Sequence, residues 1–279
     1  MGKRAAKDSC NKPGFKKRKF TNVSKLIDPF SSGIYATCAR RKEKQARQEL
    51  MSILLDKLPQ YFNLEDLHAD ADSNGGNDTR DLSIEEKIER ELQELKDSET
   101  NTKNNLLQPI DLDCECVIFI KTKKPISPEV LVQKLVRDCY DSGVKTTRYT
   151  QKLIPISDSC TATGEEPREQ LRQLAKRVLR DHFHKEKDQK PIKFAIQVGK
   201  KNFNAMESEE MIKVIAECVG REHGHSVDLK NYDKLILVEC YKNNIGIGVV
   251  DDYLKYSKFN LQQIFDKSIA RATLGSEAS

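Results

Sequence analysis

Apolar residues in the first half of the chain recur with the spacings of alternating strands and helices. Residues 33–38 (GIYATC) form a short apolar run, which predicts a strand. A run with helical spacing follows. Its inward positions are Ala46, Leu50, Ile53, Leu54 and Leu58. Pro59 is expected to close this helix, because proline cannot continue the backbone hydrogen-bond ladder. Residues 114–120 predict the next strand.

Ser127 and Pro128 mark the start of a second helix in this half. Serine is a preferred N-cap and proline a preferred first-turn residue. The inward positions of this helix are Leu131, Leu135 and Cys139. Another strand is expected within residues 147–156, and one more near residues 64–67. Together these elements give a βαββαβ order, which is typical of a ferredoxin-like fold.

A polar insertion interrupts this unit. Residues 69–82 have turn composition and no hydrophobic period, and residues 97–105 form a second polar linker. Between them, Ser83 and Glu86 form a capping box that begins a short helix with a narrow apolar seam. We expect the whole insertion, about residues 69–105, to be flexible and acidic.

The second half of the chain repeats the alternation of helices and strands. Pro167 begins a long helix. Its inward positions are Leu171, Leu174, Val178, Leu179 and Phe183. Residues 192–198 predict a buried strand. Ser208 is expected to cap another helix, which stops at Gly220, the residue type best suited to the left-handed C′ position. The inward positions of that helix are Met211, Ile212, Ile215, Cys218 and Val219.

Two β-branched runs, residues 235–240 and 245–250, predict a hairpin with its turn at residues 242–244. From Asn260 onward, apolar residues at helical spacing predict a docking helix, which packs either on its own domain or on a partner. The predicted fold class is therefore α/β (α+β), with two mixed units in succession.

Composition limits the class of protein. A chain of 279 residues allows one large or two small domains, and 37% hydrophobic against 33% charged residues indicates solvated segments rather than a compact enzyme throughout. No apolar run approaches the roughly 20 residues that span a bilayer, and the N-terminus is too polar for a signal peptide. We expect an intracellular protein without a membrane partner.

The eight cysteines are expected to be free structural thiols in a reducing compartment. Cys114 and Cys116 would share one face of a strand, but no second pair completes a tetrahedral metal site. Two histidine pairs are also incomplete as ligand sets: His182 with His184, and His223 with His225. The sequence therefore predicts no metal.

The net charge of +5 conceals a segregation along the chain. Residues 1–25 carry nine Lys and Arg against the single acid Asp8, whereas residues 65–99 are dominated by acids. A basic arm attracts polyphosphate, and it reads equally as a nuclear import signal or as a phosphate-binding tail. The candidate RNA-binding residues of the arm are Lys16, Lys17, Arg18 and Lys19.

Three further cationic clusters follow the arm. The first cluster places cations at the start of the first helix. The helix dipole disfavours cations there, but an external anion such as RNA phosphate would fit. The second interleaves cations with hydroxyls and Tyr149, and the third directly follows a predicted strand, where α/β sheets usually place ligands. The clusters are Arg40, Arg41 and Lys42; Lys145, Arg148 and Lys152; and Lys200, Lys201 and Asn202. Each alone also fits a solvated face, but together with the arm they favour an RNA-binding surface.

One motif resembles a cofactor loop. Residues 243–248 (NNIGIG) come near the Q/R-x-x-G-x-G loop with which acetyltransferases hold the pyrophosphate of acetyl-CoA. A strand continues through Val249 and Val250, however, where that loop needs a helix N-terminus, so structural glycines are the favoured reading. No nucleotide-binding fingerprint or nucleophile elbow occurs either. We expect no cofactor and no catalytic residues.

An ordered series of motifs in the second half resembles a THUMP domain, an RNA-binding module. The motifs are KLIPI (152–156), KFAIQVGKKNF (193–203), IAECVG (215–220), HSVDLKNYDKLILVEC (225–240) and NNIGIGVV (243–250). With PGFKKRK in the arm and no catalytic domain after it, the whole chain is similar to the family of eukaryotic THUMP-domain adaptors of tRNA cytidine acetylation. Position 201 departs from the pattern, because it is Lys where THUMP strands often end in Arg.

The resemblance implies a non-catalytic protein that binds the acceptor stem and 3′ end of tRNA. Its partner would be a separate RNA cytidine acetyltransferase, which makes N4-acetylcytidine in the D-arm of serine and leucine tRNAs. The implied location is the nucleus and nucleolus, with the cytoplasm as a further site.

The domain organisation that follows has four parts. We expect a disordered basic arm at residues 1–30, a ferredoxin-like domain at 31–147, a THUMP domain at 148–255, and a C-terminal helix and tail at 256–279. Two other functions stay open: a transferase with a divergent acetyl-CoA site, and a ribosome-assembly factor without specific tRNA binding, whose arm is only an import signal.

Overall fold

The computed structural model of the chain describes residues 27–63, 106–164 and 166–277, with the side chains of the last helix described as far as residue 270. Three expectations concern residues outside these ranges. They are the strand near residues 64–67, the capping box of Ser83 and Glu86, and the arm with Lys16, Lys17, Arg18 and Lys19.

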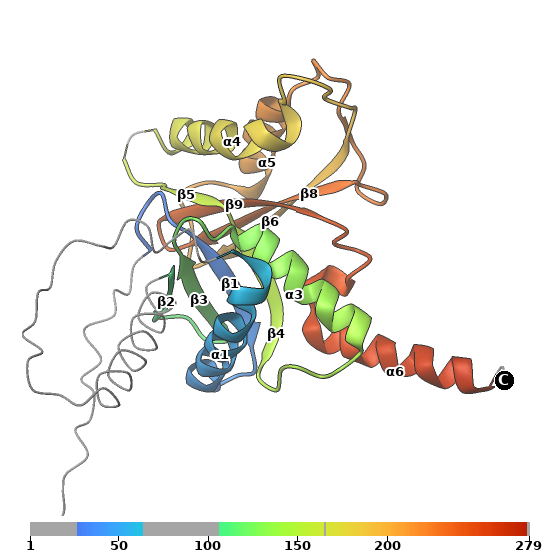
Figure 1. Ribbon diagram of the computed structural model, residues 1–279. Coiled ribbons are helices and arrows are strands. Elements are labelled where there is room, and N and C mark those ends of the chain that lie inside the picture. The colour runs from blue at the N-terminus through green and yellow to red at the C-terminus, as the bar shows by residue number, and fades with distance from the viewer. Residues whose placement is uncertain (1–26, 64–105, 165, 278–279) are drawn as a thin grey trace, which may run out of the picture.

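The first module is a four-stranded sheet with two helices on one face (Figure 1). Its elements are β1 (Ser32–Cys38), α1 (Glu43–Tyr61), β2 (Leu107–Ile110), β3 (Val117–Thr122), α3 (Pro128–Ser142) and β4 (Thr150–Ile156). The strand order is β2-β3-β1-β4, and each neighbouring pair is antiparallel. This confirms the predicted βαββαβ order of a ferredoxin-like fold.

The helix signals of the first module hold with one exception. Ser127 caps α3, since its Oγ accepts a hydrogen bond from Val130 N at 3.3 Å. In α1, Leu50, Leu54 and Leu58 are buried as expected, but the prediction that Pro59 closes the helix is wrong. Proline removes only its own N–H from the ladder, and the backbone N–H of Phe62 still reaches the Leu58 carbonyl at 2.9 Å.

The strand predictions of the first module need two corrections. The described strand between α1 and β3 is β2, at the edge of the sheet, where Pro109 is tolerated because an edge strand can spare one donor. Cys114 and Cys116 precede β3 rather than lying on it, and Cys116 has a φ of +61° in the turn that leads into the strand.

The second module is a five-stranded sheet with two helices on one face (Figure 1). Its elements are β5 (Asp158–Thr161), α4 (Pro167–Phe183), β6 (Lys193–Lys201), α5 (Ser208–Val219), β7 (Ser226–Val227), β8 (Lys234–Tyr241) and β9 (Asn244–Asp251). The order is β5-β9-β8-β6-β7, with β6 parallel to both β7 and β8. The helix from Pro167 and the hairpin of β8 and β9 are confirmed, whereas β5 and β7 were not expected from the sequence.

Three details of this module differ from expectation. Glu207, not Ser208, occupies the N-cap of α5, and no side chain caps the helix there. Ile212 is 37% exposed rather than inward. Only Phe194 and Ala195 of β6 are fully buried, because β7 pairs only with Lys193 and Phe194 and leaves the rest of β6 at the edge of the sheet. Gly220 does end α5 with a positive φ of 67°.

The two modules share one core. Along β8, Ile236 and Val238 face α4 and α5, whereas Leu235 and Leu237 pack into the core of the first module. The alternation follows from the period of two in a strand, and it leaves both faces of the second sheet covered. β4 belongs to the first sheet, so the chain passes from one sheet to the other at Ser157.

The C-terminal helix α6 (Leu261–Glu277) follows a short 3-10 turn, η2 (Ser257–Phe259), and lies beside α3 (Figure 1). It contacts α3 and β4, and its first turn buries Leu261 and Ile264. Between the two options left open by the sequence, the first turns of the helix therefore dock on the chain's own first module.

Candidate nucleic-acid interface

Apart from Lys152, which lies within β4, the predicted cations of the described residues gather at one end of the two sheets, which we call the basic rim. It consists of the turn at residues 39–42, the loop at residues 145–150, and the ends of β6 and β8 at residues 200–202 and 241–243. A backbone hydrogen bond from Ala39 N to the Tyr149 carbonyl, 3.0 Å long, holds the first two segments together. Two predicted clusters that are far apart in the sequence are therefore neighbours.

The turn before α1 presents its cations to solvent. Arg40, Arg41 and Lys42 are all exposed. Arg41 has a φ of +61°, which lets the chain reverse before the helix starts. Arg40 Nε lies 3.3 Å from Glu115 Oε2, in an ion pair whose side chains are largely exposed. Such a pair is weak, so the guanidinium can exchange it for a phosphate.

Glu49 of α1 fixes the neighbouring loop. Its carboxylate accepts hydrogen bonds from the backbone N–H groups of Arg148, Tyr149 and Thr150, at 2.5, 3.1 and 2.9 Å. The backbone of the loop is thereby held against α1, while the Arg148 guanidinium lies 5.3 Å from the centroid of the Tyr149 ring on the outside. Arg148 and Lys145 are both exposed.

Lys201 does not point into solvent. Its Nζ lies 2.6 Å from Glu239 Oε2, and Glu239 is only 5% exposed. The pair sits between the two sheets, where Lys201 Nζ is 6.0 Å from the Tyr35 ring centroid. Lys152 shares this seam: burial lowers its pKa and Lys201 lowers it further, whereas Glu239 acts in the opposite direction. The ammonium groups of both lysines are therefore turned toward the module interface.

Lys200 and Asn202 lie at the end of β6. Lys200 Nζ donates to the Met206 carbonyl at 3.1 Å and lies 3.4 Å from Glu207 Oε2, so it ties the loop before α5 to the strand. Asn202 is exposed and has a φ of +52°, a conformation that short polar residues tolerate. Of residues 200–202, only Asn202 is exposed to solvent.

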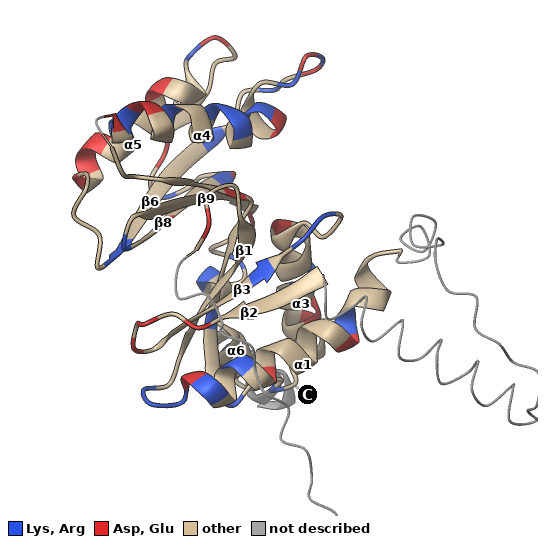
Figure 2. Ribbon diagram, turned by 90° about the vertical axis from the view of Figure 1, so that its left-hand side faces the viewer, with Lys and Arg blue, Asp and Glu red and all other residues tan. Residues whose placement is uncertain are grey.

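An acidic loop crosses the rim between its cationic parts. The backbone N–H of Asp113 donates to the Tyr241 hydroxyl at 3.0 Å, which joins the loop at residues 111–116 to the end of β8. Figure 2 shows the cationic positions at the end of β6 and at the turn before α1, with acidic positions between them. The sequence did not reveal this arrangement, because the loop meets the other segments only through tertiary contacts.

The glycines of NNIGIG are packing residues within β9. A Cβ on Gly248 would stand 2.1 Å from the Pro155 carbonyl oxygen, and one on Gly246 would stand 2.5 Å from Ile156 Cγ2. The missing side chains let β9 cross closely over β4. This supports the structural reading of the motif, since its backbone faces β4.

The described part of the chain lacks two features. No three or more His, Cys, Asp or Glu side chains there are arranged to hold a metal ion. None of the helices in residues 27–63, 106–164 and 166–277 is long and apolar enough to cross a membrane.

Comparisons with known proteins agree with the motifs. The THUMP domain profile matches residues 168–250. The chain is 43% identical to the protein named tRNA acetyltransferase TAN1 of Saccharomyces cerevisiae, over 97% of both chains. It is 32% identical to an uncharacterized Schizosaccharomyces pombe protein, over 86% of this chain and 77% of that one. It is 30% identical to THUMP domain-containing protein 1 of Bos taurus, over 85% of this chain and 64% of the relative.

Proposed function

The chain belongs to the family of THUMP domain-containing proteins, and from this membership we propose that it binds tRNA and takes part in tRNA acetylation. The observation that carries the proposal is the similarity to the yeast protein named tRNA acetyltransferase TAN1, which extends over 97% of both chains and so includes both modules. The shared core of the two modules supports a single RNA-binding unit, because it holds the cationic segments of both in one fixed arrangement.

Within that function, the proposed role is that of a non-catalytic adaptor. It presents serine and leucine tRNAs to a separate RNA cytidine acetyltransferase, which forms N4-acetylcytidine in the D-arm. The packing of Gly248 against Pro155 supports this role, since the one motif that resembles an acetyl-CoA loop is used to join β9 to β4. An adaptor acts by proximity: it raises the effective concentration of its tRNA at the enzyme.

The proposed contacts with the acceptor stem and 3′ end are the exposed side chains of the basic rim: Arg40, Arg41, Lys42, Lys145, Arg148 and Asn202. Lys152, Lys200 and Lys201 were also predicted to contact RNA, and for them we propose instead a role in shaping the rim. The hydrogen bond of Lys200 to the Met206 carbonyl and the ion pair of Lys201 with Glu239 support this role. The arm residues 16–19 are proposed to clamp RNA backbone and to direct the protein to the nucleus.

Reconstitution tests the proposal. The purified chain, the purified acetyltransferase and unmodified serine tRNA are combined with acetyl-CoA, each protein alone and both together, and acetylcytidine is measured in the recovered tRNA. We expect tRNA binding but no product with the chain alone, and product when both proteins are present. Product from the chain alone would make it the enzyme, and absence of tRNA binding at low salt would reject the RNA-binding role.

A further inference from the structure

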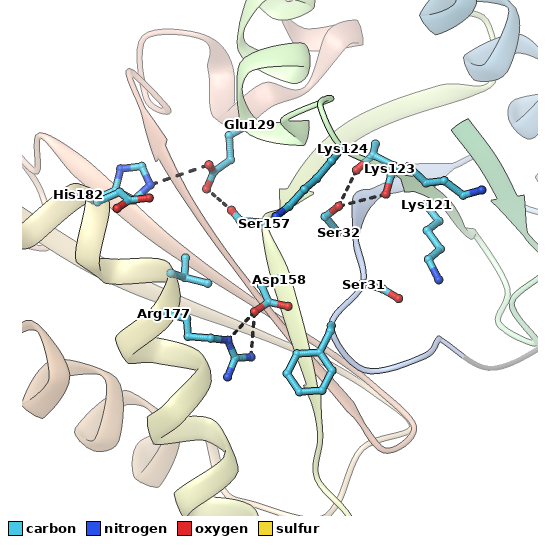
Figure 3. A pocket seen from close by; sticks show the side chains of 14 residues that line it. Ser31, Ser32, Lys121, Lys123, Lys124, Glu129, Ser157, Asp158, Arg177 and His182 are labelled. Carbon is cyan, nitrogen blue, oxygen red and sulfur yellow. Dashed lines mark hydrogen bonds and ion pairs between the residues drawn. The ribbon is translucent and has the colours of Figure 1, made fainter. Parts of the chain in front are cut away.

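A polar cleft lies between the modules, at the other end of the first sheet from the basic rim. β1 begins at Ser32 beside this cleft and ends at Cys38 beside the rim. The cleft has a volume of about 650 Å³ and is walled by the ends of β1 and β3, by β5 and by helices α3 and α4 (Figure 3). This volume is within the range of small-molecule and cofactor sites.

Phe30 stands at the mouth of the cleft and is 73% exposed. Its backbone N–H donates to the Ser159 carbonyl at 2.8 Å, which fixes the turn that carries it. The guanidinium carbon of Arg177 lies 4.9 Å from the ring centroid, and Arg177 is itself held by Asp158 Oδ2 at 2.9 Å from Nε and 2.8 Å from Nη2. The ring is thus anchored and backed by a cation, yet most of its surface faces solvent. An aromatic face held in this way is a platform on which a nucleobase can stack.

The charge of the cleft favours an anion. Lys121 lies near the end of β3 and is paired with Asp28, with Nζ 3.3 Å from Oδ2. Lys123 and Lys124 follow the strand and are exposed, and the side chain of Lys124 extends into the cleft in Figure 3. Two of the acids in the wall are already engaged. Asp158 holds Arg177, and Glu129 accepts hydrogen bonds from the Ser157 hydroxyl and from a backbone N–H of β9. Asp181 is a third acid in the wall, so three acids stand against the three lysines and Arg177. The exposed Lys123 and Lys124 are the cations that an incoming phosphate would meet.

We propose that this interdomain cleft binds an unpaired nucleotide of RNA, with the base stacked on Phe30 and the phosphate against Lys124. The inference rests on the proposed function only in taking RNA as the ligand of the chain. An exposed aromatic ring beside cations is complementary to a nucleotide, because the ring can stack on the base while the cations bind the phosphate. A free phosphate would not contact the ring, and the bases of a duplex are already stacked.

The test uses Phe30→Trp, because the chain contains no tryptophan and the new indole becomes its only fluorophore of that kind. The full-length variant is titrated with a single-stranded RNA heptamer, with the same sequence as a duplex, and with inorganic phosphate. Leu229→Trp serves as the control, since Leu229 is 74% exposed on the second module and does not line the cleft. We expect the single strand to quench the tryptophan at position 30 and to leave the one at position 229 unchanged.

A binding measurement completes the test. Phe30→Leu should weaken binding of the single strand roughly 5- to 150-fold, the equivalent of one lost stacking contact, while Phe30→Trp retains it. The side chain is exposed, so the thermal melting of both variants should match that of the unsubstituted chain. Lys124→Gln should weaken binding and reduce its salt dependence.

Three results would overturn the cleft site: a tryptophan at position 30 that does not respond to the single strand, one that responds equally to duplex or to phosphate, and unchanged affinity in Phe30→Leu. As a control, binding of labelled whole tRNA to the unsubstituted chain, which has no tryptophan, is measured by fluorescence anisotropy. If the unsubstituted chain does not bind tRNA, the proposed function is rejected. If it binds tRNA but the fluorescence of the tryptophan at position 30 does not change, only the cleft site is rejected.

Discussion

Lys201 and Glu239 form an ion pair in the seam between the two sheets, with Nζ 2.6 Å from Oε2. They occupy neighbouring parallel strands, and Gly199 lies directly opposite Glu239 in the register, where any Cβ would stand 2.5 Å from the carboxylate. The Glu239 carboxylate is therefore the counter-charge of this seam, and it also acts on Lys152, whose pKa it raises. The pair lies within the second sheet, at the face that meets the first module, where Lys201 Nζ is 6.0 Å from the centroid of the Tyr35 ring of β1.

Replacing Glu239 with Gln should destabilise the fold by roughly 3 kcal/mol, the usual order for removing one partner of a buried pair. The loss arises because Lys201 and Lys152 would remain half-buried without their counter-charge. Urea denaturation at pH 7 measures the change as a shift in the midpoint at constant slope. The matched control is the double variant Lys201→Met with Glu239→Met, which removes both charges and should lose less. A single variant as stable as the unsubstituted chain would contradict the role given to this pair.

Replacing Glu49 with Gln tests how the rim is held. The carboxylate bonds to three successive N–H groups at residues 148–150, and a neutral amide cannot replace all of these charge-assisted bonds. We expect a loss of about 2 kcal/mol in unfolding free energy and weaker tRNA binding, since Arg148 would no longer be fixed. Arg148→Gln should weaken binding with little effect on stability. Equal stability in the Glu49 variant would show that the loop does not depend on this carboxylate.

Local signals predicted the elements of the fold, and long-range contacts decided the site. The cap of Ser127 and the apolar spacing of α1 concern residues within a few positions of each other, so the sequence alone places them. The strand β2 was missed because it has four residues and contains Pro109, which argues against a strand unless its edge position is known.

The site was harder to predict for a related reason. The alternation along β6 shows that Lys200 and Lys201 point to opposite faces of the sheet. It does not show that Glu239, 38 residues later, lies on the same face as Lys201. Likewise, nothing local in the sequence around Glu49 marks its contact with a loop about 100 residues away. A cationic cluster in the sequence therefore gives charge, whereas the tertiary structure decides which of its members reach solvent.

Replacing Gly248 with Ala distinguishes the two readings of NNIGIG. The new Cβ would stand 2.1 Å from the Pro155 carbonyl oxygen, so β9 and β4 must separate, and we expect a loss of about 3 kcal/mol in stability. Gly164→Ala is the control, because its Cβ would meet open space and only its φ of +108° is unfavourable, at a cost of roughly 1 kcal/mol. A stable Gly248 variant that loses acetyl-CoA binding would revive the cofactor reading.

Protonation of His182 should destabilise the fold in mild acid. Burial lowers the pKa of this histidine, and Lys234 lowers it further, while Glu129, Asp251 and Asp181 oppose the shift. Because the folded pKa lies below the unfolded value near 6.5, the unfolded chain binds more protons between the two values. The free energy of unfolding should therefore decrease as the pH falls below about 6.5.

The variant His182→Gln isolates this effect. It should lose less stability between pH 7 and pH 5 than the unsubstituted chain, as measured by urea denaturation at several pH values. The same pH dependence in both proteins would assign the acid sensitivity to other groups.

Replacing the three cations of the turn at residues 40–42 with Gln tests the rim as an RNA-binding surface. These side chains are exposed, so the fold should be unaffected, whereas tRNA affinity should fall. If each contacts one phosphate, the slope of log affinity against log salt should decrease by about one per lost contact, up to roughly three. Fluorescence anisotropy with labelled tRNA at several salt concentrations gives both quantities.

A change of net charge alone would also weaken binding to a polyanion, and a matched variant separates the two causes. Lys185, Lys187 and Lys190 are exposed in the loop between α4 and β6, away from the rim, and their replacement by Gln removes the same three charges. Long-range attraction is screened beyond about 10 Å at 0.1 M salt, so this variant should keep most of the affinity and nearly the full slope. If both variants lose the same slope, the turn before α1 makes no direct phosphate contact, and the RNA-binding face must be sought elsewhere on the molecule.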